Sequence, residues 1–158
     1  MAIVGTPRIY HHKYKFVVEL DGFSSSGFQK CSELSAEVGD VEYSEGGTLY
    51  PDVSPGRVKF TELTLSRGAT SDIDMYRWYN QVISAAANSG LVDPAFRRNG
   101  HIVQLERDGA ALRRWQLWSA YPKKFVAGEW DNEADEVVIE QLTLKFKYFD
   151  MAGFVPSI

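Results

Sequence analysis

Apolar and polar residues alternate along several stretches of this chain, and a period of two predicts β-strands that are buried on one face. Residues 14–20 form the clearest such stretch, which an Asp-Gly dipeptide ends. Residues 28–45 predict one long or interrupted strand, broken near Gly39-Asp40. In residues 58–65 the apolar positions change parity, which a β-bulge near Thr61-Glu62 would explain.

Further strands are predicted in the second half of the chain. Residues 101–107 and 112–121 flank Asp108-Gly109, a strong hairpin signal, so we expect antiparallel neighbours joined by a two-residue turn. Residues 138–148 predict a long final strand with an apolar face and a polar face. The apolar face holds Val138, Leu142, Leu144, Phe146 and Tyr148, and the polar face holds Gln141, Thr143, Lys145 and Lys147.

One segment predicts an α-helix. Ser71 can cap its start, Asp74 occupies the capping-box position three residues later, and Gly90 ends it. Apolar residues recur between these ends at helical spacing, at Ile73, Tyr76, Tyr79 or Asn80, Ile83 and Ala87. We expect the helix to lie against a sheet.

These elements predict a mainly β protein with about six or seven strands and one helix. The pattern favours a β-sandwich or a small β-barrel with one flanking α-helix. The chain has 158 residues, a length that suits a single domain over 1–158. A domain of this size buries enough surface to fold without disulfides or metals.

Composition excludes several classes of function. The net charge of −4 lacks the basic footprint of a nucleic-acid-binding protein, so specific nucleic-acid binding is not expected. The single Cys31 cannot form an intramolecular disulfide, which fits folding in a reducing cytosol. The first residues lack the pattern of a signal peptide, and no apolar run is long enough to span a membrane. We therefore expect synthesis in the cytoplasm.

No catalytic, cofactor-binding or metal site is predicted. His11-His12 would point to opposite sides of an extended segment, and His101 has no ligand partner at a helpful spacing. The acidic stretch 129–136 lacks the glycine and glutamate spacing of a calcium loop, so a solvated loop is the better interpretation. No serine sits in a nucleophile elbow, and Gly46-Gly47 lack the lysine of a phosphate-binding loop.

The segment from Glu42 to Gly68 predicts a contact with another molecule. Its first part is a loop rich in glycine and proline, and long loops that persist in small domains usually make contacts or are disordered. The strand that follows argues against disorder. Trp130 lies in a polar loop and is a second candidate, since tryptophan is enriched at the hot spots of interfaces; a partly exposed loop aromatic without such a role is the alternative. The predicted interface residues are Gly46, Gly47, Tyr50, Pro51, Pro55, Gly56, Arg57 and Trp130.

Three groups of residues carry a resemblance to a known family. The first is the segment Glu42–Gly47 followed by Pro55–Lys59 and Leu63–Gly68, and the second is Trp78 in the predicted helix. The third comprises Trp115, Leu117, Ala120, Tyr121, Pro122 and Lys124, followed by Asp135-Glu136 and Val137–Glu140. In this order they resemble the tail tube proteins of contractile phages and of phage-derived contractile injection systems. Residues 1–12 and 149–158 match the pattern least well.

The resemblance implies an architecture like that of Hcp, the tube protein of type VI secretion, and a structural role without enzymatic activity. It implies hexameric rings that stack into an inner tube, with sheath and baseplate proteins as partners and cargo passing through the lumen. The assembled particle would be a phage tail or an injection particle that is extracellular after release. The lumen face should be polar, formed by Gln141, Thr143, Lys145 and Lys147 or by Gln104 with Glu106.

Two alternatives remain beside the main tube subunit. One is a monomeric carbohydrate- or ligand-binding β-domain, which the aromatic content of 13% would also suit. The other is the ring protein that starts the tube at the baseplate. Both would share the predicted fold.

Overall fold

The computed structural model describes residues 5, 10, 15–22, 27–87 and 96–152. Within these ranges the chain is mainly β, with one α-helix. The elements are β1 (Phe16–Leu20), β2 (Lys30–Cys31), β3 (Ala36–Tyr43), β4 (Asp52–Phe60), β5 (Leu63–Gly68), α1 (Asp74–Ala87), β6 (Arg98–Leu105), β7 (Ala111–Val126), β8 (Ile139–Lys145) and β9 (Tyr148–Met151).

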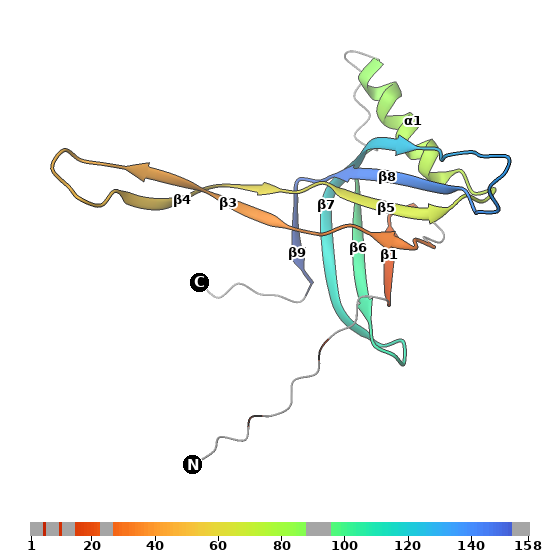
Figure 1. Ribbon diagram of the computed structural model, residues 1–158, viewed down its shortest axis with the longest axis horizontal. Helices are drawn as coiled ribbons and strands as arrows, with labels where there is room; N and C mark the ends of the chain where they lie inside the picture. The colour runs from red at the N-terminus through yellow and green to blue at the C-terminus, as the bar shows by residue number, and fades with distance from the viewer. Residues whose placement is uncertain (1–4, 6–9, 11–14, 23–26, 88–95, 153–158) are drawn as a thin grey trace.

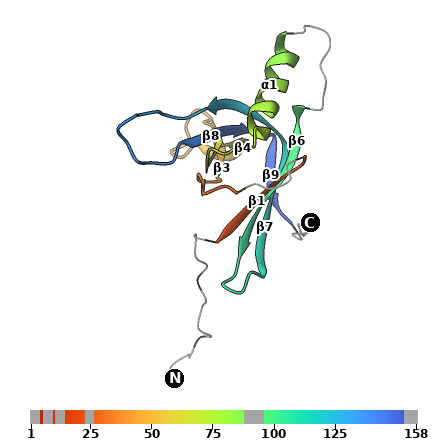
Figure 2. The ribbon, with the colours of Figure 1, turned by 90° about the vertical axis from the view of Figure 1, so that its right-hand side faces the viewer.

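Two layers of antiparallel strands share β7. The first layer has the order β1-β6-β7-β9 and the second has the order β7-β8-β5-β2, and Figures 1 and 2 show them crossing at a steep angle. The first half of β7 belongs to the first layer and the second half to the second layer. At the passage between them Ser119 adopts a positive φ of 53°, which is uncommon for a residue other than glycine. Leu117 and Ala120 are therefore both buried, although they are three residues apart.

The core lies between the layers and under α1. Its largest fully buried side chains include Leu63 and Leu65 of β5, Leu117 of β7, and Leu142 and Leu144 of β8. Alternation along each strand turns these side chains to the inner faces. The predicted β-sandwich with one flanking helix is confirmed, and the described sheets do not close into a barrel.

The helix forms where it was predicted, and Tyr79 of its predicted apolar stripe is half-buried and stacks on Phe125 of β7, but the rest of the stripe is not the buried face. Met75 and Trp78 are fully buried, while Ile73, Tyr76 and Ile83 are largely exposed. The residue predicted to cap the helix is also wrong. The helix begins at Asp74, whose backbone N–H donates to Oδ1 of Asp72 at 3.1 Å, so Asp72 and not Ser71 supplies the capping oxygen.

Two predicted strands are each divided between two different sets of paired strands. The parity change near Thr61-Glu62 is not a bulge within one strand, because β4 ends at Phe60 and β5 begins in a different sheet. The stretch 138–148 likewise divides into β8, which pairs with β7 and β5, and β9, which pairs with the first half of β7. The predicted break near Gly39 is a register shift between Val38 and Asp40 within a continuous strand, and the interruption of the stretch 28–45 lies between β2 and β3 instead.

The β6–β7 hairpin is confirmed, but its turn differs from the prediction. The Glu106 N–H donates to the Ala110 carbonyl at 2.8 Å, and the Gly109 N–H donates to the Glu106 carbonyl at 3.0 Å. The loop therefore has three residues, and Gly109 has a φ of +91° while Asp108 does not have a positive φ. This is the geometry of a type I turn followed by a glycine bulge.

Candidate assembly interface

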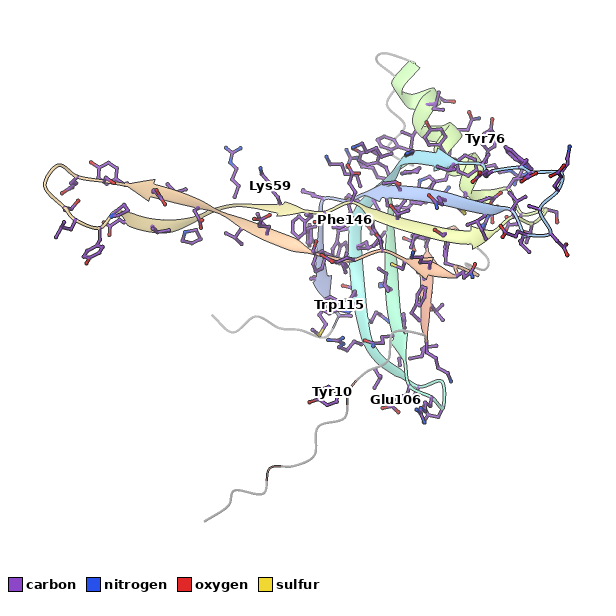
Figure 3. All side chains as sticks on the ribbon, in the orientation of Figure 1. Tyr10, Lys59, Tyr76, Glu106, Trp115 and Phe146 are labelled. Carbon is purple, nitrogen blue, oxygen red and sulfur yellow. The ribbon has the colours of Figure 1, made fainter. Side chains whose placement is uncertain are left out.

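A long β-hairpin projects from the two layers and forms the most prominent feature of the molecule (Figures 1 and 3). We call it the arm and define it as residues 36–60, that is β3, the turn 44–51, and β4. Its two strands pair with each other in an antiparallel register from Ala36↔Phe60 to Tyr43↔Asp52. Among the described strands, neither pairs with any other.

Glycines allow the arm to bend and to turn. At the register shift, a Cβ on Gly56 would lie only 3.0 Å from the Gly39 carbonyl oxygen, so a larger residue there would force the strands apart. At the tip, Gly47 has a φ of +95°, and the Thr48 hydroxyl donates to the Glu45 carbonyl at 2.7 Å. The arm is therefore a defined hairpin with a structured tip.

The arm exposes apolar side chains along its whole length. Leu49 is 90% exposed and Tyr50 is 85% exposed, and Val38, Val41, Tyr43, Val53 and Val58 are also largely exposed. An isolated two-stranded hairpin is marginally stable in water. Large exposed apolar side chains gathered on one projecting hairpin favour interaction with another molecule.

The arm is also acidic. It contains five carboxylates and two basic side chains, namely Glu37, Asp40, Glu42, Glu45 and Asp52 against Arg57 and Lys59. Both basic residues lie in β4. In the outer part of the arm, residues 40–54, every charged side chain is a carboxylate. A partner surface that covers the tip should therefore be apolar and positively charged.

Seven of the eight predicted interface residues lie together in the arm. Gly46, Gly47, Tyr50 and Pro51 are in its turn, and Pro55, Gly56 and Arg57 are in β4. The prediction of one long loop is wrong for residues 52–56, which are strand. Sequence reasoning missed Val38, Val41, Tyr43, Leu49, Val53 and Val58. The signal for them was the β-branched and aromatic content of residues 36–58, which indicates strands rather than a loop.

Trp130 lies apart from the other predicted residues. It belongs to the segment 127–138 between β7 and β8, which Figure 1 shows at the end of the molecule opposite to the arm. Trp130 is 71% exposed and borders a hollow of about 430 Å³, together with acidic residues such as Glu129 and Glu136. Asp131 orders this segment, since its Oδ1 accepts from the Glu133 N–H at 3.0 Å.

The described residues offer no centre for chemistry. Within them, no group of three His, Cys, Asp or Glu side chains could hold a metal ion. His11-His12 lie outside the described residues. Cys31 is half-buried, and burial raises the pKa of its thiol to about 11, so the thiol stays protonated at neutral pH. No helix in the described part is long and apolar enough to cross a membrane.

Comparison with known families decides what kind of protein carries this arm. The model of the T4-like virus tail tube protein gp19 family matches residues 12–150. The chain belongs to this family. Members are structural components of tails, so the chain is not an enzyme. The segments 42–68 and 115–140, on which the sequence resemblance was based, lie inside the matched region.

Solved structures share the fold of this tail tube family member. One is a chain in the tube-terminating cap of the anti-feeding prophage, with 24% identity, 96% and 98% of the two chains covered and a TM-score of 0.79. A chain in the extended sheath–tube complex of the extracellular contractile injection system PVC has 20% identity, 90% of each chain covered and a TM-score of 0.75. Hcp1 from Flavobacterium johnsoniae has 14% identity, 88% and 95% coverage and a TM-score of 0.52. No curated protein matches the chain significantly.

Proposed function

We propose that this chain is the subunit of the inner tube of a contractile tail or injection system. Copies associate side by side into six-membered rings, and rings stack around a lumen through which cargo passes transiently. The observation that carries the proposal is the arm, whose apolar side chains find no cover among the described residues of their own chain. A second copy of the same chain supplies that cover.

The free edges of the first layer support closure into a ring. Among the described strands, β1 pairs only with β6, and β9 pairs only with β7, so each leaves one backbone edge unpaired. Exposed strand edges favour aggregation, and cyclic association removes them by joining the edge of one copy to the edge of the next. The two edges are different surfaces, which is the condition for a head-to-tail ring.

The partners follow from the same proposal. The similar solved chains come from baseplate, tube-cap and sheath–tube complexes of contractile injection systems, which supports sheath and baseplate proteins as partners here. We place residues 1–158 in one tube domain that is made in the cytoplasm and incorporated into a phage tail or an injection particle. This function does not involve specific nucleic-acid binding, because any cargo must pass through the lumen without adhering to it.

Shortening the arm tests the proposal. We would replace residues 40–56 by Asn-Gly, which keeps the Val38↔Val58 pair and closes the hairpin with a short turn. None of the removed residues is buried, so the subunit should melt at the wild-type temperature. Wild-type protein should form rings or tubes in negative-stain images, and the shortened protein should not.

A control variant tests whether assembly depends on the arm or on exposed apolar side chains anywhere on the surface. Ile73→Ser with Ile83→Ser changes two exposed apolar side chains, one just before α1 and one on it, and this variant should assemble as the wild type does. Normal assembly of the shortened protein would show that the arm is not the interface. A wild-type protein that stays monomeric over a wide concentration range would contradict the tube function and favour a ligand-binding β-domain.

A further inference from the structure

An apolar groove of about 290 Å³ crosses the inner face of the first layer. Each of the four strands of this layer contributes at least one side chain to the floor of the groove. Residues 31–34 close the groove on the side of the second layer. The apolar lining consists of Phe16, Cys31, Leu34, Ile102, Trp115 and Phe149. Such a groove is a continuation of the core that the described residues leave unfilled.

The groove is open because the two layers have different lengths. The β6–β7 hairpin extends the first layer well beyond the second, as the lower part of Figure 1 shows. Ile102 is buried, while its cross-strand partner Trp115 and the neighbouring Phe16 are only half-buried. Figure 3 labels Trp115 in this lower region.

The rim of the groove is positively charged. Lys15 lines it, and Arg113 stacks over the ring of Trp115, with 5.6 Å between Cζ and the ring centroid. Arg113 is held in place by Gln104, whose Oε1 accepts from the Arg113 guanidinium at 3.0 Å. No carboxylate is among the lining residues. The groove therefore suits an occupant that combines large apolar side chains with negative charge.

We propose that this groove receives the tip of the arm of a second copy. The inference rests on the tube function proposed above and names the surface on which the arm docks. The tip carries Leu49 and Tyr50, the two most exposed large apolar residues of the arm, next to Glu45 and Asp52. Tyrosine is enriched at interface hot spots because its ring offers a large rigid contact.

The geometry requires that the groove belong to another copy. The arm leaves the body on the side of β9, and its tip lies at the far left of Figure 1, well away from the groove of its own chain. The contact joins two different surfaces of the same protein, so it repeats from copy to copy and supports a ring or a stack instead of a closed dimer.

Site-specific photocrosslinking locates the docking surface. Benzoylphenylalanine would replace Tyr50 in the full-length protein, assembled rings or tubes would be irradiated, and the crosslinked peptides would be identified by mass spectrometry. We expect crosslinks from the tip to peptides that contain Phe16, Leu34, Trp115 or Phe149. As a matched control, the same probe at the exposed Val137 at the opposite end of the molecule should give no crosslink to these peptides.

A charge reversal tests the rim independently. Arg113→Glu should reduce assembly and lose the crosslinks from position 50, because it sets a carboxylate against the acidic tip. Arg77→Glu makes the same change of charge on the exposed face of α1 and should assemble normally. Equal melting temperatures of the two variants would show that both are folded.

The results of these experiments distinguish failure of the proposed docking site from failure of the proposed tube function. Rings that form normally while position 50 crosslinks only to other surfaces would overturn the groove and leave the tube function standing. Normal assembly of Arg113→Glu with unchanged crosslinks would overturn the role of the rim. Failure of the wild type to assemble would overturn the tube function and the groove with it.

Discussion

Arg67 and Glu140 lie directly opposite each other on β5 and β8, with 3.3 Å between Nε and Oε2. The Arg67 side chain is 6% exposed and the Glu140 side chain is 16% exposed, so the ion pair is almost enclosed. The Arg67 guanidinium also donates to the Asp72 carbonyl at 3.1 Å and lies 5.8 Å from the ring of Phe28. Arg67 thus connects the second layer to the start of α1 and to the segment before β2.

Removing one partner of this pair should destabilise the subunit strongly. Glu140→Ala should lower the free energy of unfolding by about 3 kcal/mol, because it removes the nearer of the two carboxylates beside the buried Arg67 and leaves only that of Asp72, at 3.9 Å. The double variant Arg67→Met/Glu140→Leu should lose less, since it buries no unpaired charge. Urea denaturation of the unassembled subunit measures both values. A double variant less stable than the single one would contradict this account.

Trp78 anchors α1 to the layers and should be the most sensitive residue of the helix. It is fully buried, its Nε1 donates to the Phe96 carbonyl at 2.6 Å, and the Arg98 guanidinium lies 5.4 Å from its ring. Trp78→Ala should cost about 3 to 5 kcal/mol of unfolding free energy. Trp130→Ala removes the same side chain from an exposed position and should cost less than about 0.5 kcal/mol. Similar losses in the two variants would refute the anchor role.

Gly109 should resist substitution for a conformational reason. A Cβ at this position would meet no atom within 4 Å, so the effect of a side chain is isolated from any clash. Because the φ of Gly109 is +91°, Gly109→Val should cost about 1 to 3 kcal/mol. Gly46→Val is the matched control, since Gly46 also has open space but no positive φ. Equal melting temperatures of Gly109→Val and the wild type would rule out this strain.

The sequence predicted strands best where one face is buried. Residues 16–20 alternate in burial, and their alternation in polarity was readable for that reason. The arm shows the reverse case, because both faces of β3 are exposed although apolar and polar residues alternate along it. The sequence predicts a strand up to residue 45, but glycine and proline at 46–56 indicate a loop, so the hairpin of β3 and β4 could not be read from it.

Other predictions were wrong because they depend on contacts between segments that are distant in the sequence. The helix carries two apolar stripes, and nothing local tells that Met75 and Trp78 are covered completely while Ile73 and Tyr76 stay exposed. The parity change at Thr61-Glu62 has the same local pattern whether a strand bulges or passes to another sheet. Only the pairing partners of β4 and β5 distinguish these cases.

Acid should weaken the start of α1 through Asp72. The hydrogen bond from the Asp74 backbone N–H is the main cause that lowers the pKa of Asp72, and the Arg67 charge adds to it. A carboxyl with a folded-state pKa below its unfolded value of about 3.9 stabilises the fold above that pH and loses this effect as the pH falls. Asp72→Asn keeps the accepting oxygen but does not titrate. The melting temperature of Asp72→Asn should therefore fall less than that of the wild type between about pH 5 and pH 2, and parallel curves would disprove the assignment.

The bore of the assembled tube should be polar. A sheet that forms the wall of a tube packs one face on the core and turns the other to the channel, and a passing cargo must not adhere to it. Gln141, Thr143 and Lys145 of β8 point away from the buried Leu142 and Leu144 and qualify for such a face. Gln104, the other candidate, lies at the inner groove with Arg113 and does not qualify. We expect a structure of the assembled tube to show a water-filled bore without a contiguous apolar patch. A bore lined mainly by Leu, Ile, Phe or Trp side chains would contradict this prediction.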